Sequence, residues 1–306
     1  MPRILVVGDV IDDVLVAPTG PLARDSDTPS RIELRAGGSA ANVAAWLGAS
    51  GIDVDFVGTV GAADVDRHSA LLASAGVRPH LRASGLPTGT IVLLLDGDAR
   101  TMLTSRGAND ETLPDVLDPA LLAAADHLHL TGYSLFSAGG DAWAGVIRAA
   151  QESGATVSVD PSSRVPLAEF GPDRFLEVTA GADVVFPNLD EGRLLAGVDD
   201  PNRVAELLLS RYPVVALTRG PQGALVRSRT GEDGDVPAAR PLGGAADPTG
   251  AGDAFAAGFL TAWTDGASIL ESALVAVETA ALAVGALGAR PARRSPEAPS
   301  PGAPVL

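Results

Sequence analysis

Short apolar runs alternate with longer segments of helical periodicity along most of the chain. The first run, from Met1 to Gly8, is β-branched and ends in glycine, which is typical of a buried strand that meets a turn. Further strand-like runs occupy 127–130, 156–160, 183–187 and 214–218, and segments of helical length separate them. Strands joined through helices are parallel, so this order predicts an α/β fold with a doubly wound, mostly parallel sheet flanked by helices.

The early third of the chain has a different pattern, in which short strands and turns replace the long helices. Residues 12–18 and 31–35 look like strands separated by a loop rich in Pro and Asp. Residues 90–95 and 101–104 form a predicted hairpin across Asp96-Gly97-Asp98. Together these strands predict a small β-sheet attached to the large one.

The remaining segments complete this outline. Helices are predicted at 39–48, 64–75, 251–264 and 270–287, strands at 53–58 and 224–227, and a polar turn at 229–235. We therefore expect one domain over residues 1–290, with the small sheet contributed by about 10–20, 30–36 and 88–105. The Pro-rich residues 291–306 are predicted to form a disordered tail.

Composition narrows the function classes. The 306 residues include 38 acidic and 22 basic side chains, and the net charge of −16 disfavours binding to nucleic acid or to anionic membrane surfaces. Cysteine and lysine are both absent, which excludes disulfides, thiolate chemistry, Schiff-base lysines and phosphate loops of the G-K-[ST] kind. A phosphate site in this chain must therefore use backbone amides, arginine or a metal ion.

The sequence has no evident targeting or membrane segment. The first apolar run, Ile4 to Val7, is too short for a signal peptide and is soon followed by Asp9. The apolar stretch from Ala273 to Ala289 contains Glu278 and is shorter than a membrane span. The chain has no cysteine residues that would indicate an oxidising compartment. We therefore expect a cytoplasmic protein that binds neither membranes nor nucleic acid.

A glycine-rich loop leads directly into an apolar helix, with the sequence Asp247-Pro-Thr-Gly-Ala-Gly-Asp253. Small residues at 250–252 let the backbone approach a ligand, and the N–H groups of the helix N-terminus can bind an anion. Asp253 is then either a base for a hydroxyl that attacks phosphorus or a plain carboxylate that stabilises the helix N-terminus. With an ordinary pKa of about 4, it is ionised at pH 7.

This loop resembles the C-terminal motif of the ribokinase (PfkB-type) carbohydrate kinase family. The segment Gly37-Gly-Ser-Ala-Ala-Asn-Val-Ala44 resembles the N-terminal motif, and the two lie as far apart as in that family. Smaller matches are Gly8-Asp9, Gly58-Thr-Val-Gly61, Asn188-Leu-Asp-Glu191 and Thr218-Arg-Gly220. The resemblance covers roughly residues 3–290 and implies a ribokinase-like fold with a small β-sheet lid.

Members of this family transfer the γ-phosphoryl group of ATP to a hydroxymethyl group of a sugar or nucleoside. By motif position, the resemblance implies that Asp253 is the catalytic base. It also implies that the amides of Gly250, Ala251 and Gly252 form an anion hole. Phosphoryl transfer depends mainly on positioning and charge stabilisation, so these groups and a metal ion can suffice.

The resemblance further implies sites for ATP and Mg²⁺. Asn188 and Glu191 match an N-x-x-E element that organises Mg²⁺ and its waters near the phosphates, and oxygen ligands suit this ion. Taken alone, they would be a loop asparagine and a helix-opening glutamate. Asp247 matches a residue near a site where many relatives hold K⁺. The residues implied to bind ATP are Asn188, Thr218, Gly220, Gly223, Gly250 and Gly252.

On the acceptor side, Gly38 and Asn42 match family positions that face sugar hydroxyls, and Ser39 between them is assigned to the same site. The amide of Asn42 can donate and accept hydrogen bonds at once. Asp13 matches an acidic residue that accepts from two hydroxyls, and the alternative is an exposed charge at a strand edge. Ribokinases have asparagine in place of Ile11 and lysine in place of Ser39, which argues against ribose as the acceptor.

Two arginines bear on the choice of substrate. Arg106 and Arg164 resemble arginines with which 2-keto-3-deoxygluconate kinases hold the substrate carboxylate, and a guanidinium can bind a carboxylate through two hydrogen bonds. The tyrosines that such enzymes often use are absent, and Thr90 and Thr104 stand in that region. A surface or ATP-side role for both arginines is the alternative.

The sequence therefore predicts an ATP-dependent carbohydrate kinase for a small sugar or sugar acid. The alternatives are a nucleoside kinase, which the aromatic content of 4% disfavours, a 2-keto-3-deoxygluconate kinase, and a non-catalytic sugar-binding regulatory protein, which the intact Asp253 disfavours. The lid is expected to exclude water on closing, and two lids paired edge to edge would form a homodimer. His127 and His129 are expected to pack in the core and not to bind metal.

Overall fold

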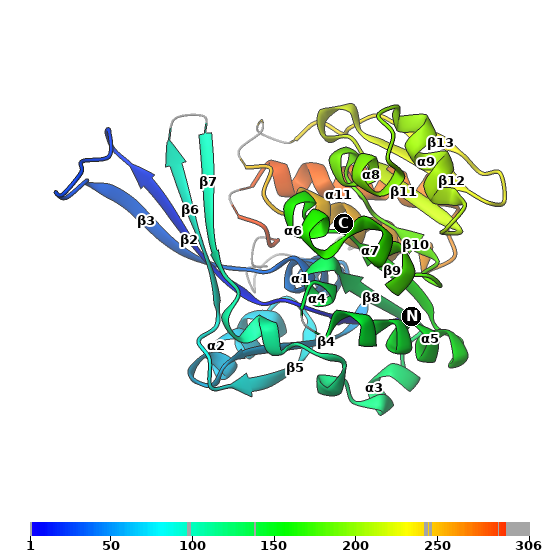
Figure 1. Ribbon diagram of the computed structural model, residues 1–306, viewed down its shortest axis with the longest axis horizontal. Helices are drawn as coiled ribbons and strands as arrows, with labels where there is room; N and C mark the ends of the chain where they lie inside the picture. Colours follow the sequence, from blue (N-terminus) through cyan, green and yellow to red (C-terminus); the bar gives the residue numbers. More distant parts are fainter. Residues whose placement is uncertain are drawn as a thin grey trace, which may run out of the picture.

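The computed structural model of the protein describes residues 2–96, 99–137, 139–241, 244, 247–286 and 288–291. Within these residues, a sheet of nine strands forms the body (Figure 1). The strands lie in the order β13 (Gly234–Val236), β12 (Ala224–Ser228), β11 (Val214–Thr218), β10 (Val184–Val185), β9 (Thr156–Asp160), β8 (His127–Thr131), β1 (Arg3–Val7), β4 (Asp53–Gly61) and β5 (Val77–Ser84). Neighbours from β11 to β5 are parallel, whereas β12 and β13 are antiparallel additions at one edge. The predicted doubly wound, mostly parallel sheet is confirmed.

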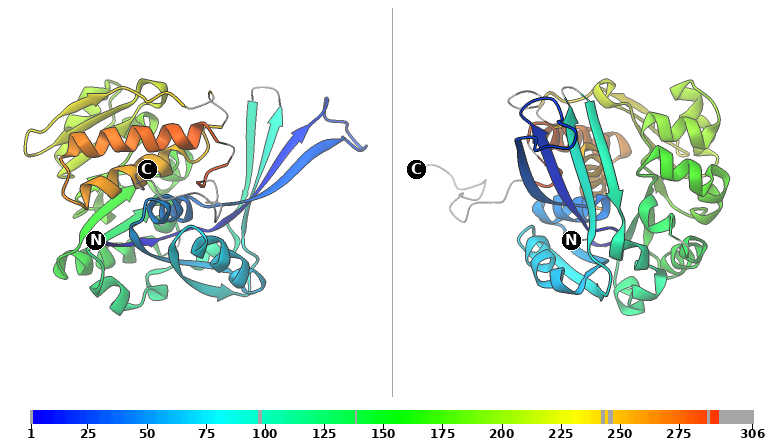
Figure 2. Two further views of the ribbon diagram at one scale, coloured as in Figure 1. Left: turned by 180° about the vertical axis from the view of Figure 1, so that it is seen from behind. Right: turned by 60° about the vertical axis from the view of Figure 1, so that its left-hand side comes forward.

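Helices cover both faces of this sheet (Figure 2). Their bounds are α1 (Ser39–Ala49), α2 (Val65–Ala73), α3 (Pro119–Ala123), α4 (Gly132–Leu135), α5 (Trp143–Glu152), α6 (Arg164–Phe170), α7 (Pro172–Val178), α8 (Leu189–Ala196), α9 (Pro201–Leu209), α10 (Ala251–Trp263) and α11 (Ile269–Val284). Side chains alternate along each strand, so β1 directs Ile4 and Val6 into the core with α1, α10 and α11. Leu5 and Val7 enter the core with α5, α7 and α9. Because both faces are covered, β1 is apolar along most of its length.

The two histidines of β8 belong to this core. Ser158 Oγ lies 2.7 Å from Nε2 of His127 and 2.8 Å from Nδ1 of His129. The rings pack against Trp263 and Phe186 respectively. Burial lowers the pKa of both imidazoles to about 3, so both are neutral at pH 7. The expectation that they pack in the core is confirmed.

A second, smaller sheet projects from the body (Figures 1 and 2). Its strands lie in the order β3 (Ser30–Gly37), β2 (Ile11–Pro18), β6 (Gly89–Asp96) and β7 (Ala99–Ser105). β2 is antiparallel to β3 and parallel to β6, so two separate hairpins join in the middle of the sheet. The expected smaller sheet is confirmed. The hairpin tip at 97–98 and the predicted tail from residue 292 onward lie outside the described residues.

The hydrophobic pattern does not predict β5. This strand lies at the edge of the large sheet, and polar and exposed residues surround Pro79 within it. An edge strand needs only one apolar face, so it carries no continuous apolar run. The predicted turn at 229–235 is wrong at its end, because β13 begins at Gly234, and the run at 183–187 provides only two strand residues. Among the described residues, no helix has the length and hydropathy needed to cross a bilayer.

Candidate active site

A cleft of about 1160 Å³ lies between the large sheet and the small sheet. Its floor forms where strands of the large sheet end and helices begin: Asp9 follows β1, Asp160 ends β9, and Gly38 precedes α1. The small sheet forms another wall, to which β2 contributes Ile11 and Asp13. Ligands of open α/β sheets bind at the carboxyl ends of the strands, so this cleft is the candidate active site.

Asp253 lies in this cleft, in the first turn of α10. Ser39 Oγ donates a 2.7 Å hydrogen bond to its Oδ1, and Asn42 Nδ2 donates a 2.9 Å hydrogen bond to its Oδ2. The two sequence motifs therefore meet at one carboxylate. Burial raises the pKa of Asp253 to about 7, although both hydrogen bonds lower it. The expectation of an ordinary, fully ionised carboxylate at pH 7 is therefore wrong, and Asp253 is a stronger base than its sequence implies.

The loop before Asp253 packs against the segment that follows α11. Gly250 has a φ of +77°, and a Cβ at this residue would lie 2.6 Å from the Cβ of Ala289. Gly252 lines the cleft, with open space where its Cβ would be, and Ala251 begins α10 between the two glycines. A ligand can therefore approach the backbone N–H groups of the first turn of α10.

The N-terminus of α1 holds half of the residues predicted for the acceptor, and these three, Gly38, Ser39 and Asn42, all line the cleft. Asp9, which the sequence analysis does not assign to the site, accepts hydrogen bonds from the backbone N–H groups of Ser39 at 2.8 Å and Ala40 at 3.1 Å. Asp9 thus satisfies the free donors of the helix N-terminus. Gly38 has a φ of +95°, and a Cβ there would lie 2.5 Å from the carbonyl oxygen of Asp9, so glycine is required.

Asp13 also lines the cleft. Its carboxylate occupies the space in which Gly37 would carry a side chain. Burial raises the pKa of Asp13 to about 6, although the charge of Arg290 lowers it, and the charge of Asp9 adds to the rise. Asp13 is half-buried on an inner strand of the small sheet, which excludes the alternative of an exposed charge at a strand edge.

Asn188 and Glu191 form a capping box at the N-terminus of α8, on the cleft wall. Nδ2 of Asn188 donates to Oε1 of Glu191 at 2.6 Å, and the backbone N–H of Asn188 donates to Oε2 at 3.0 Å. Burial raises the pKa of Glu191 to about 7. Burial and the charge of Glu191 also raise the pKa of Asp160, which the sequence analysis does not assign to the site. Two neighbouring carboxyl groups that resist ionisation suit a bound cation.

The oxygen atoms of Asn188 and Glu191 are the type of ligand that Mg²⁺ prefers, but they are too few to hold the ion alone. Within the described part of the chain, no group of three or more acidic or histidine side chains is arranged to hold a metal ion. A magnesium ion at Asn188 and Glu191 therefore needs further oxygen atoms, from water or from nucleotide phosphates.

Asp247, the residue predicted to lie near a K⁺ site, is outside the cleft lining. Its Oδ1 accepts hydrogen bonds from the backbone N–H and the Oγ1 of Thr249, at 3.0 Å and 2.7 Å.

The structure separates the residues predicted for ATP into two groups. Those that line the cleft are Asn188, Thr218, Gly250 and Gly252. Asn188 and Thr218 are also joined by an isolated parallel bridge, which brings the ends of β10 and β11 together. Gly220 and Gly223 follow β11 but lie outside the cleft lining.

Of the two arginines predicted to hold a carboxylate, Arg106 lines the cleft and Arg164 does not. Arg106 donates to the carbonyl oxygen of Tyr133 at 2.8 Å and to Oδ1 of Asp110 at 2.6 Å. Arg164 is exposed at the start of α6. The structure therefore does not bring the predicted pair together. Arg174, which no motif predicts, lines the cleft as well.

Several charged residues in or beside the cleft are not assigned to it from the sequence, among them Asp9, Asp160, Arg174 and Arg290. Asp9 and Asp160 stand at the ends of predicted strands, a position that indicates a ligand site in an α/β sheet and could have revealed them. Arg290 carries no such signal, because it follows the last helix and directly precedes the Pro-rich tail. Only the path of the chain brings its guanidinium to Asn42, at 3.1 Å.

Comparison with known proteins identifies the family. The chain matches the model of the pfkB family carbohydrate kinases over residues 1–296. It is 34% identical over 306 aligned positions to an ATP-dependent ribose-1-phosphate kinase of Halopiger xanaduensis, with 95% of each chain covered. It is 30% identical over 272 positions to a 1-phosphofructokinase of Rhodobacter capsulatus, with 85% of this chain and 81% of that one covered. An E. coli protein assigned as ribokinase II and solved with ATP and Mg²⁺ has the same fold, with a TM-score of 0.83, 23% identity and 94% of each chain covered. This chain therefore belongs to the pfkB family of carbohydrate kinases, phosphotransferases that act on sugar hydroxyl groups.

Proposed function

We propose that this kinase transfers the γ-phosphoryl group of ATP to a hydroxymethyl group of a small sugar, with Asp253 as the base. The hydroxyl oxygen bonds to the γ-phosphorus, the bond from that phosphorus to ADP breaks, and the hydroxyl proton passes to Asp253. The proposal rests on the position of Asp253, which lies in the cleft and accepts hydrogen bonds from both Ser39 and Asn42. Its raised pKa, about 7, makes it an effective proton acceptor near neutral pH.

The anion hole consists of the backbone N–H groups of Gly250, Ala251 and Gly252. Their place at the N-terminus of α10 supports this role, because the helix dipole favours a negative charge there. The chain lacks lysine, so these amides replace the lysine of other phosphate loops. Thr218 lies on the same cleft wall as Asn188 and is assigned to ATP with it, whereas Gly220 and Gly223 act at most through the shape of the turn after β11.

Asn188 and Glu191 are proposed to hold Mg²⁺ through water, beside Asp160. When bound, the ion neutralises charge on the phosphates of ATP. The raised pKa values of Glu191 and Asp160 support a cation at this end of the cleft. We also propose a K⁺ site at Asp247, which lies at the start of the loop that provides the anion hole.

Acceptor hydroxyls are proposed to bind Asp13, Gly38, Ser39 and Asn42. The side chains of Ser39 and Asn42 already contact Asp253, so a hydroxyl bonded to them lies beside the base. Asp13 reaches the same pocket from the small sheet. Closure of this sheet as a lid would therefore bring a sugar-binding carboxylate and a water-excluding wall onto the acceptor together.

Arg106 favours an acceptor that carries an anionic group, either a sugar phosphate or a sugar acid. Its side chain is 27% exposed in the cleft, and a guanidinium with free donors can bind such a group. The two curated relatives described above are named for kinases of phosphorylated sugars. A nucleoside is the rival acceptor, because Tyr133, Phe136 and Phe170 line the cleft with aromatic rings.

We further propose that two copies pair through the small sheet, with a face and not an edge as the contact. The face opposite the cleft is apolar, and Ile32, Leu34 and Leu103 on it are 62%, 77% and 59% exposed. Leu34 lies opposite Val14, Val14 opposite Val92, and Val92 opposite Leu103, so one apolar row crosses all four strands. Such a patch is unusual on a monomer, and a two-fold axis lets the same row cover itself.

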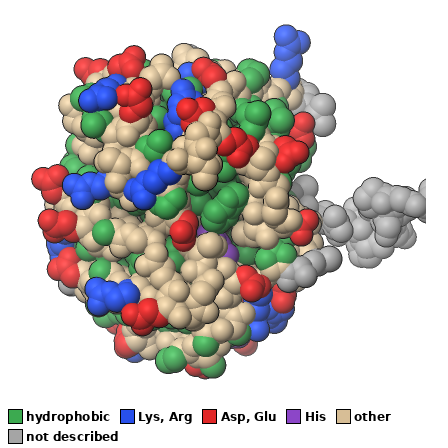
Figure 3. All heavy atoms as spheres, turned by 90° about the vertical axis from the view of Figure 1, so that its right-hand side faces the viewer, with side chains coloured by type: hydrophobic (Ala, Val, Ile, Leu, Met, Phe, Trp, Pro, Cys, Tyr) green, Lys and Arg blue, Asp and Glu red, His purple; other side chains and the backbone are tan. Residues whose placement is uncertain are grey.

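ATP as the donor and the absence of cysteine fit a cytoplasmic location, which we propose for this kinase. Figure 3 shows Asp and Glu side chains spread over one face of the molecule among the arginines. Together with the net charge of −16, this distribution supports the expectation that the protein binds neither nucleic acid nor a membrane surface.

The test of this function is turnover of MgATP with a panel of ribose, ribose 1-phosphate, fructose, fructose 1-phosphate, 2-keto-3-deoxygluconate and adenosine. We expect saturable ADP production with one anionic sugar. Asp253→Asn should lower kcat about a thousandfold and leave ATP binding intact. Asp265→Asn, an exposed position just beyond the other end of α10, is the matched control.

Three outcomes would contradict the proposal. Near-normal turnover of Asp253→Asn would remove this residue as the base. No turnover of the wild type with any acceptor, while ATP still binds, would favour a sugar-binding regulatory protein. Turnover of adenosine alone would instead assign the nucleoside kinase.

A further inference from the structure

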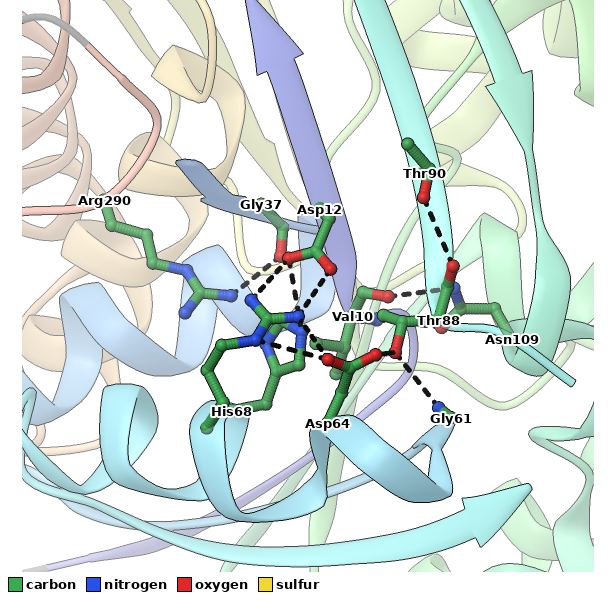
Figure 4. Close-up of polar contacts among 11 residues, drawn as sticks. Val10, Asp12, Gly37, Gly61, Asp64, His68, Thr88, Thr90, Asn109 and Arg290 are labelled. Carbon is green, nitrogen blue, oxygen red and sulfur yellow. Dashed lines mark hydrogen bonds and ion pairs between the residues drawn. The ribbon is translucent and has the colours of Figure 1, made fainter. Parts of the chain in front are cut away.

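Arg290 lies behind the acceptor site, in the segment that follows α11. Its Nε donates to Oδ1 of Asn42 at 3.1 Å. Its Nη2 donates to the carbonyl oxygen of Gly37 at 2.7 Å (Figure 4). Asn42 in turn donates from Nδ2 to Oδ2 of Asp253 at 2.9 Å. A continuous chain of hydrogen bonds therefore runs from Arg290 through Asn42 to Asp253.

This chain fixes the orientation of the Asn42 amide. An asparagine side chain has one oxygen that accepts and one nitrogen that donates, whereas a guanidinium only donates. The Asn42 oxygen must therefore face Arg290, which leaves the nitrogen to face the ionised oxygen of Asp253. Without Arg290, rotation of the amide by a half turn would place an oxygen against the carboxylate.

The segment that carries Arg290 is itself anchored to α1 and to the glycine loop. Trp46 Nε1, on α1, donates to the carbonyl oxygen of Ala289 at 2.9 Å. On the other side, Ala289 packs so closely on Gly250 that a Cβ at the glycine would lie 2.6 Å away. Arg290 is therefore held in place by both α1 and the loop before α10.

Arg290 also places a positive charge among acidic groups. Burial lowers its pKa to about 10, so it remains protonated at pH 7. Its Nη1 is buried and has no hydrogen-bond partner among the described residues. The charged or titratable groups around Arg290 and Asp253 are Asp9, Asp12, Asp13, Arg35, Tyr133 and Asp160. Of the acidic groups, Asp9, Asp12, Asp13 and Asp253 gain electrostatic stabilisation from the guanidinium.

We infer that Arg290 is a positioning residue for phosphoryl transfer, which holds the Asn42 amide toward the base and supplies a fixed cation behind the acceptor carboxylates. The inference rests on the proposed role of Asp253. It extends the active site to residues 288–291, a segment that no sequence motif assigns to it.

The test compares Arg290→Gln, which removes the charge, with Arg290→Lys, which keeps the charge but loses the several N–H donors of the guanidinium. Arg290→Gln should lower kcat about tenfold with little change in the KM of ATP, because a misplaced base slows the chemical step. In this variant the acidic limb of the pH profile, where kcat/KM falls as the pH is lowered, should shift to higher pH by about half a unit or more. Loss of a nearby cation raises the pKa of a carboxyl group. Arg290→Lys should restore the limb and part of kcat.

A matched control is Arg229→Gln, because Arg229 also donates to two backbone carbonyls, at 2.9 Å each, but on the exposed surface far from the cleft motifs. It should leave the pH limb in place. A second readout needs no turnover: the pKa of Asp253 is measured by NMR titration of ¹³C-labelled aspartate, with the signal assigned by Asp253→Asn. We expect this pKa to be higher in Arg290→Gln than in wild type.

The outcomes separate this inference from the proposed function. An unchanged pKa of Asp253 in folded Arg290→Gln overturns the inference, whether or not the enzyme turns over. Loss of thermal stability with an unchanged pH limb also overturns it, because that result indicates a structural role alone. No wild-type turnover with the whole acceptor panel overturns the proposed function, and the NMR titration then still decides the electrostatic effect of Arg290.

Discussion

At the scale of single residues, burial changes the acid–base chemistry of the cleft. The pKa of Asp253 is raised to about 7 because desolvation outweighs the hydrogen bonds from Asn42 and Ser39. Burial likewise raises the pKa of Asp13 to about 6 and that of Glu191 to about 7. Several displaced carboxyl groups in one cleft are typical of a catalytic site.

The activity should therefore depend on pH through Asp253. The ionised form accepts the proton, so kcat/KM should rise with pH and level off above a pH of about 7. Ser39→Ala removes a hydrogen bond that stabilises the ionised form, so its limb should lie at higher pH. Initial rates measured at pH values on both sides of about 7 give the acidic limb of the wild type and that of Ser39→Ala. Ser50→Ala is the control, because Ser50 Oγ donates to the Trp46 carbonyl near the other end of α1. A limb that does not move in Ser39→Ala would contradict this assignment.

At the scale of elements, one hydrogen-bond network attaches the small sheet to the body at its two roots, which are the start of β2 and the residues just before β6 (Figure 4). Arg67 of α2 donates to the two carboxylate oxygens of Asp12 in β2, at 2.8 Å and 2.6 Å. Thr88, just before β6, accepts from the N–H of Gly61 at 3.0 Å and donates to Asp64 at 2.6 Å. Arg67 also donates to Asp64 at 2.8 Å, so it connects the two roots.

Arg67→Ala should loosen the lid and weaken acceptor binding more than ATP binding. An exposed ion pair contributes about 1 kcal/mol, so the KM of the acceptor should rise about fivefold. Steady-state kinetics with each substrate varied in turn measure the two effects. Arg203→Ala, which removes an exposed ion pair with Glu206 on α9, should change neither KM. Equal increases in both constants would show that the network supports the whole fold and not the lid in particular.

At the scale of the whole molecule, the small sheet has one face on the cleft and an apolar face directed outward. Leu34→Glu should convert the proposed dimer into a monomer, because its carboxylate would be buried in the contact without a partner. Size-exclusion chromatography with light scattering measures the mass. Leu274→Glu, on α11 and starting from 48% exposure, is the control and should stay dimeric. A wild-type protein that is monomeric at every concentration would contradict the dimer.

How much could be predicted from the sequence also differs between these scales. Buried parallel strands require apolar runs, so the large sheet was evident from local patterns, whereas the half-polar edge strand β5 was not. Glycines at close approaches, such as Gly38 and Gly250, kept both motifs recognisable. Arg106 and Arg164 looked equivalent in sequence, and only the fold places one in the cleft and the other on the surface.

The sequence by itself determined the alternation of buried strands and helices, the small sheet, the excess of acidic residues and the glycine loop before Asp253, because each depends on composition or on near neighbours in the chain. Only the tertiary structure decided the chemistry of that residue. Ser39 and Asp253 are 214 positions apart, and their hydrogen bond forms because the chain brings α1 and α10 together. Desolvation and the charge of Arg290 likewise depend on everything packed around the site, which no local pattern encodes.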